Sequence, residues 1–142
     1  MTPDLTLARN LLDTGKYTCA VCRADISYTA TDRGVAPLLN WMNAGLDLQD
    51  FSAADRVVGR ATAFLYALLG VKEVYAGVMS KPAAEVLTSH GISASWGKLV
   101  EGIINRRGDG PCPFEAAVLE ISDAREALTA IRIKKEQMER RN

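Results

Sequence analysis

A glycine-rich turn that runs into a cysteine and then a helical pattern offers the best candidate for chemistry in this chain. Asp109–Pro111 forms the turn, and Pro113 suits the first helical position because its missing N–H would be unpaired there anyway. Cys112 is then predicted to cap the helix, with Glu115 in its first turn. Unpaired N–H groups and the positive end of the helix dipole favour thiolate over thiol. We therefore treat Cys112 and Glu115 as catalytic candidates, with a small apolar Cys112 packed under a helix end as the alternative.

The loop before this turn carries groups that could bind an anion. Asn105 and Arg106 supply hydrogen-bond donors, and the glycines that follow permit tight turning or close approach to a ligand. A solvated loop explains the same composition equally well. Both interpretations stay open, and we count Asn105 and Arg106 as candidate ligand-binding residues.

The remaining cysteines and the single histidine are expected to be structural. Cys19 and Cys22 lie in a β-leaning run, Tyr17–Arg23, and residues three apart in a strand point to opposite faces. One sheet face cannot then present both thiols to a metal. His90 falls in the last turn of a predicted helix, and a lone histidine excludes any site that needs two.

The composition argues against several classes of partner. Seventeen basic residues balance seventeen acidic ones, so the chain lacks the basic footprint of a nucleic-acid-binding protein. No segment reaches the roughly 18 apolar residues that a membrane span needs. The N-terminal residues Met1–Asp4 lack the pattern of a signal peptide, and three cysteines without a framework spacing fit a reducing compartment. We therefore expect a cytoplasmic protein that binds neither nucleic acid nor membranes.

Hydrophobic periodicity predicts alternating helices and strands in one domain. Ser52 is followed three residues later by the acid Asp55, a pattern like a capping box, so a helix is expected from there to about Leu69, ended by Gly70. The first predicted element is a helix that Thr2 caps, that begins at Pro3 and that Gly15 ends. The other predicted elements are strands at Tyr17–Arg23 and Ile26–Thr29 joined by a hairpin at Ala24–Asp25, a helix around Pro37–Met42, a strand at Val71–Met79, a helix from Ser80 to His90, a short strand at Ile92–Trp96, a helix at Cys112–Leu119, and a last helix capped by Ser122–Asp123.

This order of elements predicts an α/β fold, with three layers of helices around a mixed sheet. One domain is expected over residues 1–133. The segment 134–142 is mostly charged, which is typical of a solvated helical tail.

Four stretches together resemble an uncharacterised bacterial family, domain of unknown function 1893. They are Arg33–Leu39, Ser52–Ala61, Gly70–Tyr75 and Cys112–Glu115, and the resemblance extends over nearly the whole chain. The family is placed with the cytidine-deaminase-like fold, so the resemblance implies that fold here.

The resemblance also exposes departures from zinc deaminases, which carry H-x-E or C-x-E on one helix and P-C-x-x-C on another. Val58 stands where the first metal ligand would be, and Arg60 where the proton-carrying glutamate would be. Pro111 and Cys112 match the second motif, but Glu115 replaces its last cysteine. Catalytic zinc needs three protein ligands, so we expect no metal and no cofactor.

The resemblance places the starts of the Asp55–Ala61 and Cys112–Glu115 helices side by side, with a crevice between them. We expect a metal-free pocket for a small nucleoside-like or anionic ligand, held by Arg60 and the helix N-termini. Two alternatives remain, an enzyme that uses Cys112 as nucleophile and a non-catalytic homo-oligomeric scaffold. The residues expected at the site are Asp55, Gly59, Arg60, Asn105, Arg106, Cys112 and Glu115.

Overall fold

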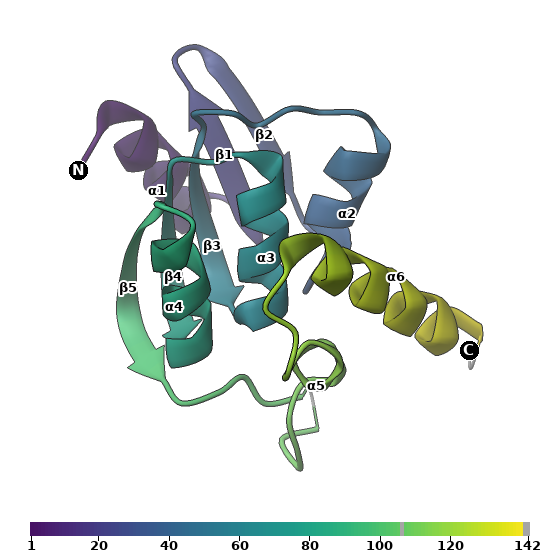
Figure 1. The fold of residues 1–142 in the computed structure, drawn as a ribbon. Coiled ribbons are helices and arrows are strands. Elements are labelled where there is room, and N and C mark those ends of the chain that lie inside the picture. The colour runs from purple at the N-terminus through teal and green to yellow at the C-terminus, as the bar shows by residue number, and fades with distance from the viewer. Residues whose placement is uncertain (106, 141–142) are drawn as a thin grey trace.

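The computed structural model describes residues 1–105 and 107–140 and contains a mixed sheet of five strands (Figure 1). The strands lie in the order β2-β1-β3-β4-β5. β1 pairs antiparallel with β2 and β3, whereas β3, β4 and β5 run parallel to one another. Their bounds are β1 Cys19–Arg23, β2 Ile26–Ala30, β3 Ser52–Val58, β4 Glu73–Ser80 and β5 Ser93–Val100.

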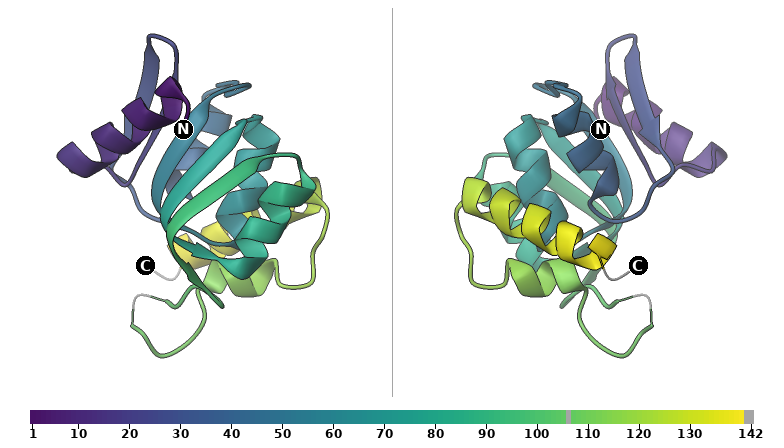
Figure 2. Two further views of the ribbon diagram at one scale, coloured as in Figure 1. Left: turned by 90° about the vertical axis from the view of Figure 1, so that its left-hand side faces the viewer. Right: turned by 90° about the vertical axis from the view of Figure 1, so that its right-hand side faces the viewer.

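Helices cover the two faces of this sheet unequally. α1 (Pro3–Thr14) packs on β1 and β3 from one side. On the other side α3 (Arg60–Leu69) and α4 (Lys81–Ser89) lie next to each other, and α2 (Ala36–Asn43) and α6 (Ala124–Arg140) pack against α3 (Figure 2). The predicted α/β class with a mixed sheet is therefore confirmed.

Two hydrophobic clusters occupy the two faces. The larger one surrounds α3, whose Phe64, Leu65 and Tyr66 are fully buried. The smaller one lies beneath α1 and consists of Ala8, Leu12, Ala20, Cys22 and Ala54. Cys19 belongs to the first cluster and Cys22 to the second, so the two thiols face opposite sides of β1, as their spacing predicts.

Helix ends follow the predicted capping chemistry at three positions. Thr2 caps α1 and its hydroxyl accepts a hydrogen bond from the N–H of Leu5 at 3.1 Å. Ser80 caps α4 in the same way, with the N–H of Ala83 at 3.1 Å. Gly70 ends α3 in the left-handed conformation, with φ of 86°, which glycine adopts without steric cost.

The prediction of a helix beginning at Ser52 is wrong. Ser52–Val58 is the central strand β3, and α3 begins at Arg60 after Gly59. The Ser52 hydroxyl donates to the Glu73 carboxylate at 2.6 Å instead of capping a helix. Ser52 and Ala53 are fully buried between neighbouring strands, so pairing and burial outweigh the local capping pattern.

The three parallel strands share an interruption at one level of the sheet. Arg56, Gly77 and Gly97 lie opposite one another, and ladder pairing skips them. A Cβ at Gly77 would lie 3.0 Å from the Arg56 carbonyl oxygen, and one at Gly97 would lie 2.9 Å from the Gly77 carbonyl oxygen. The backbones therefore approach closely where only glycine fits.

This shared kink changes which residues face the main core. Before it, the inward residues are two apart, as with Val74 and Ala76 in β4. After it, the next inward residue is Met79, three positions on. β3 shows the same change, because both Ala53 and Val58 belong to the core.

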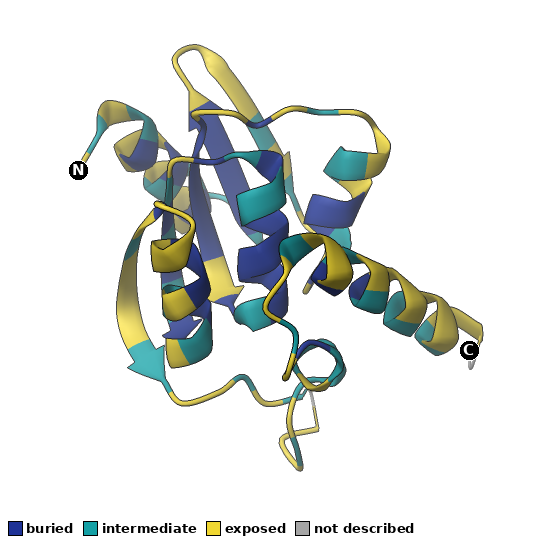
Figure 3. Ribbon diagram, in the orientation of Figure 1, coloured by how far each residue is buried: buried dark blue, intermediate teal, exposed yellow. Residues whose placement is uncertain are grey.

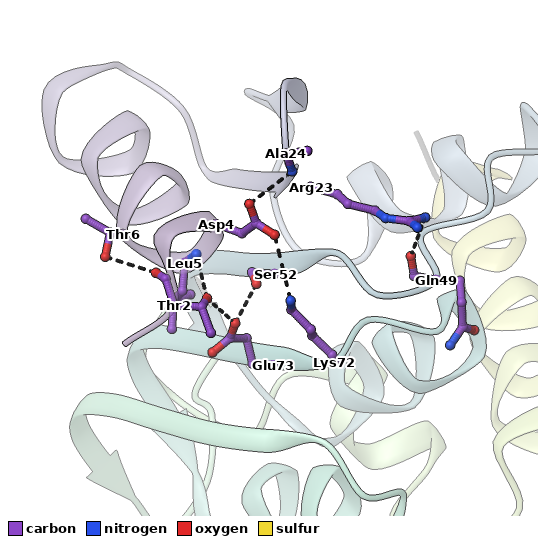
Figure 4. A network of polar contacts seen from close by, with 10 residues as sticks. All are labelled: Thr2, Asp4, Leu5, Thr6, Arg23, Ala24, Gln49, Ser52, Lys72 and Glu73. Carbon is purple, nitrogen blue, oxygen red and sulfur yellow. Dashed lines mark hydrogen bonds and ion pairs between the residues drawn. The ribbon is translucent and has the colours of Figure 1, made fainter.

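A network of polar contacts connects the start of α1 to the amino ends of β3 and β4 (Figure 4). Both Thr2 and Ser52 donate hydroxyl hydrogen bonds to the Glu73 carboxylate. Asp4 accepts from the N–H of Ala24 at 3.0 Å, which ties α1 to the β1–β2 turn. These contacts lie at the ends of the parallel strands opposite to Val58 and Gly59, where the candidate site was predicted.

β5 extends further than predicted, and α6 includes the described part of the charged tail. β5 continues to Val100, through residues that the sequence left unassigned. α6 continues to Arg140, so the described part of the charged segment, 134–140, is helical. Among the described residues, every helix is too short or too polar to cross a membrane.

Candidate functional site

Glu115 contacts the N-terminal end of α3 and forms the centre of the candidate site. It lies in the short helix α5 (Pro113–Ala117), which Figure 1 places beside the first turn of α3. Its carboxylate accepts hydrogen bonds from the backbone N–H groups of Arg60 at 2.6 Å and Ala61 at 2.8 Å. These two N–H groups have no partner within the helix, and the helix dipole favours a negative group here. Glu115 therefore caps α3 from a segment 55 residues away in the chain.

Gly59 makes this approach possible. It precedes the first residue of α3 and provides no side-chain cap. A Cβ at this position would lie 2.5 Å from a carboxylate oxygen of Glu115. Any larger residue would push Glu115 away from the two N–H groups, so Gly59 takes part by leaving space.

The side chain of Arg60 makes the reciprocal contact. Its Nε donates to the carbonyl of Val118 at 3.2 Å, and its guanidinium also donates to the carbonyl of Ile121. Val118 is the residue that ends α5. The guanidinium also lies over the ring of Phe64, 5.0 Å from its centre. Arg60 thus holds the end of α5 while Glu115 holds the start of α3.

Cys112 caps α5, as predicted, and is partly exposed. Its backbone N–H donates to the carbonyl of Ile103 at 3.0 Å, and its own carbonyl accepts from Ala116 at 3.1 Å. Its side chain forms no capping hydrogen bond. Pro113 occupies the first helical position, as its ring geometry predicts.

Asp55 does not belong to this group, because it lies in β3 beneath the middle of α3. Its carboxylate accepts a hydrogen bond from the hydroxyl of Tyr66 at 2.7 Å, and the side chain is 8% exposed. Burial raises the pKa of Asp55 to about 7, although hydrogen bonds from Tyr66 and from the N–H of Val57 oppose the shift. Cys19 lies opposite Asp55 in the β1–β3 pairing, and burial together with the Asp55 charge raises the pKa of its thiol.

Tyr66 is the residue that sequence analysis missed. It is fully buried, and burial followed by the nearby Asp55 charge raises the pKa of its hydroxyl. One signal was present in the sequence: a tyrosine in a helix that is apolar all round needs a polar partner for its hydroxyl. The sequence could not say which partner, because Asp55 was assigned to the wrong kind of element.

Of the two predicted loop residues, the structure describes Asn105. The Asn105 amide donates to the Asp109 carboxylate at 2.9 Å and accepts from the Asp109 N–H at 3.2 Å, so it is engaged within its own loop. Arg106, the second predicted loop residue, lies outside the described residues. Of the seven predicted site residues, the structure brings together Gly59, Arg60 and Glu115, with Cys112 on the same short helix as Glu115.

Two hollows on the surface lie away from this group. One, of about 450 Å³, lies between α2 and α6 and is lined by Asn40, Asn43 and Arg132, among others. The other, of about 460 Å³, lies between α4 and β5 and includes Glu85 and Trp96. Neither is lined by Glu115 or Cys112.

The donor set at the site does not resemble a metal centre. Val58, at the position that the resemblance gives to a zinc ligand, ends β3 and is fully buried in the core. The Glu115 carboxylate at the α3 terminus already accepts two backbone hydrogen bonds. Among the described residues, no three histidine, cysteine or acidic side chains are close enough together to hold one ion.

Comparison with known proteins identifies relatives of uncharacterised function. A family model described as TM1506, Domain of unknown function (DUF1893), matches residues 7–134. A crystal structure of a DUF1893 family protein, TM1506, from Thermotoga maritima has a similar fold, with a TM-score of 0.83. The two sequences are 24% identical, and the match covers 96% of this chain and 92% of that chain. No curated protein matches the chain.

Proposed function

The chain belongs to the DUF1893 family, and we propose that within this family it binds a small anionic ligand at the N-terminal end of α3. The observation that carries the proposal is the Glu115 carboxylate, which accepts hydrogen bonds from the N–H groups of Arg60 and Ala61. A carboxylate already occupies this position, supplied by the chain itself. A ligand with a carboxylate or phosphate group would take its place.

Movement of α5 would release three donor groups together. Glu115 and the carbonyls of Val118 and Ile121 belong to one segment. Glu115 accepts from the N–H groups of Arg60 and Ala61. The two carbonyls accept from the Arg60 guanidinium. When α5 leaves, two backbone N–H groups and one guanidinium become free at the same place. A planar guanidinium beside two N–H groups suits an oxyanion with several acceptor atoms, such as a nucleotide phosphate.

We also propose a cytidine-deaminase-like, three-layer arrangement in which no metal takes part. The support is the helix α1 on one sheet face, α3 and α4 on the other, and parallel strands that lead into α3 and α4. Arg60 stands where such enzymes carry the proton-shuttling carboxylate, and a guanidinium cannot act as a base. Binding without hydrolytic deamination is the expected behaviour.

The alternative of a Cys112 nucleophile has weaker support. A thiol needs an activating base, and Glu115, the nearest acidic residue along α5, is held by α3 through two hydrogen bonds. His90 lies at the end of α4, where its Nδ1 is 2.8 Å from the carbonyl of Val86. The geometry therefore favours a binding role over covalent catalysis.

The test measures binding of inorganic phosphate and cytidine 5′-monophosphate by calorimetry and thermal shift. Glu115→Ala removes the internal competitor, so we expect roughly tenfold tighter binding than in the wild type. Arg60→Gln added to Glu115→Ala should abolish that gain. Glu120→Ala, an exposed acid in the next segment, is the matched control and should bind like the wild type.

Two outcomes would contradict the proposal. One is that neither probe binds to Glu115→Ala, which would leave Glu115 as a structural cap alone. The other is that both probes bind equally well with and without Arg60→Gln, which would place the anion elsewhere. Release of ammonia from cytidine by the wild type, well above background, would contradict the expected lack of deamination.

A further inference from the structure

The outer edge of β5 is an extended, open row of backbone groups. β5 ends the sheet, and no other segment among the described residues pairs with its outer side. It spans eight residues, and most of it is exposed (Figure 3). Lys98 is its only charged residue, and it contains no proline. Proteins normally protect such an edge with charges, proline, a cover or a partner.

We propose that β5 pairs antiparallel with β5 of a second copy of this chain, about a twofold axis between Trp96 and Gly97. In this register every residue of the strand has a partner: Ser93 faces Val100, Ala94 faces Leu99, Ser95 faces Lys98, and Trp96 faces Gly97. A continuous ten-stranded sheet would result. The proposal is independent of the ligand site at α3.

The kink at Gly97 makes this full-length pairing possible. In a regular strand, two residues whose numbers differ by an odd amount point to opposite faces, so Ala94 could not face Leu99 across a pair. Here both Ala94 and Leu99 pack against the main core on the helix-covered face. The interruption of the ladder at Gly97 therefore shifts the alternation of faces by one residue, so that Ala94 and Leu99 lie on the same face and can pair across the interface.

The opposite face matches in the same way. Ser95 pairs with Tyr75 in β4, and Tyr75 packs on the cluster beneath α1, so Ser95 points to the α1 side. Lys98 precedes the inward-facing Leu99 and is exposed, which places it on that side too. In the proposed register the single lysine of each β5 strand faces a serine of the other, and no like charges meet.

Trp96 supplies the apolar contact on the helix-covered face. Its side chain lines the hollow of about 460 Å³ between β5 and α4, and the residue is 40% exposed. Across the proposed interface it faces Gly97, which has no side chain, so the indole can cover the partner strand. The partner's Trp96 does the same by symmetry.

The experiment places charges at Ser95 and measures the dimer dissociation constant by sedimentation equilibrium. Ser95→Glu creates two Glu–Lys98 pairs per dimer, so we expect roughly fivefold tighter association. Ser95→Lys sets two lysine pairs opposite each other and should weaken association by a similar factor. Ser95→Lys combined with Lys98→Glu creates the same two opposite-charge pairs with the charges exchanged, so association should be about as tight as in Ser95→Glu, which only this register predicts.

Thr29→Glu is the matched control, because it adds the same charge to an exposed position of the other edge strand, β2. It should leave the dissociation constant unchanged. The proposal is overturned if the wild type and Ser95→Glu both sediment as monomers over the whole concentration series. It is equally overturned if a dimer forms whose dissociation constant does not respond to Ser95→Lys.

Discussion

Two acidic residues contact helix α3 at different places, and each has a cysteine near it. Asp55 lies beneath the helix and opposite Cys19 in the sheet. Glu115 lies at the start of the helix, on the same short segment as Cys112. The first pair is buried, whereas the second is partly exposed. The same two chemical groups therefore occur in two opposite environments around one helix.

The two carboxylates differ in the hydrogen bonds that replace those they make with water in the unfolded chain. Asp55 receives one hydroxyl, from Tyr66, and a long hydrogen bond of 3.4 Å from the N–H of Val57. These contacts do not offset burial, and its pKa rises to about 7. Glu115 receives two short N–H contacts at the positive end of a helix dipole, an arrangement that favours a negative charge. The depth of burial and the position relative to the helix end thus separate a carboxylate that destabilises the fold when ionised from one that caps a helix.

The largest expected effect is a pH dependence of stability that Asp55 causes. The pKa of Asp55 is about 7 in the folded state, above its value of about 3.8 when unfolded. Between these values unfolding releases a proton, so the free energy of unfolding falls as pH rises and levels off above about pH 7. The shift corresponds to a loss on the order of 4 kcal/mol between pH 4 and pH 8. Asp55→Asn should remove this fall, as urea unfolding across that pH range would measure.

Asp25→Asn, at an exposed position in the β1–β2 turn, is the matched control and should unfold with the wild-type pH profile. Tyr66→Phe sharpens the test, because the Tyr66 hydroxyl lowers the Asp55 pKa. Its removal should move the end of the fall to higher pH. A wild-type profile that is flat from pH 4 to pH 8 would show that Asp55 is hydrated or paired in solution.

A smaller effect is expected at Glu115. Glu115→Ala leaves the N–H groups of Arg60 and Ala61 without their acceptor, so the free energy of unfolding should fall by about 1–2 kcal/mol. Unlike the Asp55 effect, this loss should persist at pH 8. Glu115→Gln keeps one acceptor oxygen and should lose about half as much. Urea unfolding beside the exposed control Glu120→Ala measures both changes.

If Glu115→Ala unfolds like the wild type, the contact between α5 and α3 contributes nothing in solution. The contrast with Asp55 would then disappear, because neither carboxylate would stabilise the fold. Gly59→Ala offers an independent check, since its Cβ would meet the Glu115 carboxylate. The double variant Gly59→Ala with Glu115→Ala should have the same free energy of unfolding as Glu115→Ala alone, because the clash needs both residues.

Sequence patterns predicted the parts of the fold that depend on local chemistry. Thr2, Gly70 and Ser80 cap their helices as expected, and the hairpin turns at Ala24, which has a φ of 52°. Pro113 and Cys112 start α5 as predicted. At the helix ends the residue type favours the observed backbone, so the sequence carries the information directly, whereas Ala24 adopts a left-handed conformation that alanine rarely takes.

The errors arose where tertiary contacts decide. Ser52 and Asp55 formed a convincing local capping pattern, yet both are buried in the central strand, with Glu73 and Tyr66 as partners. The local pattern did not indicate that this segment pairs with neighbouring strands. Tertiary contacts also decide the arrangement at the candidate site. Arg60 and Glu115 lie together, and there Glu115 binds the start of α3 while Arg60 binds the end of α5. Sequence can place two groups near each other without showing that the protein itself occupies the space between them.

The smallest expected effect concerns the two cysteines in the comparison. Burial raises the pKa of Cys19, and Cys22 on the other face of β1 is also buried with a raised pKa. Cys112 is partly exposed at a helix start. The thiolate is the reactive form, so limiting iodoacetamide at neutral pH should alkylate Cys112 at least roughly tenfold faster than either of the others. Peptide mapping after a short reaction measures the three rates.

Glu115→Ala should change one of these rates and leave the others alone. If α5 leaves α3, Cys112 becomes more exposed and its alkylation accelerates, while Cys19 stays covered by α3. Cys112→Ser gives the background labelling of the two strand cysteines. Equal rates at Cys19 and Cys112 in the wild type would mean that the sheet opens as readily as the surface segment. The two carboxylate–cysteine pairs would then share one environment in solution, and the contrast around α3 would fail.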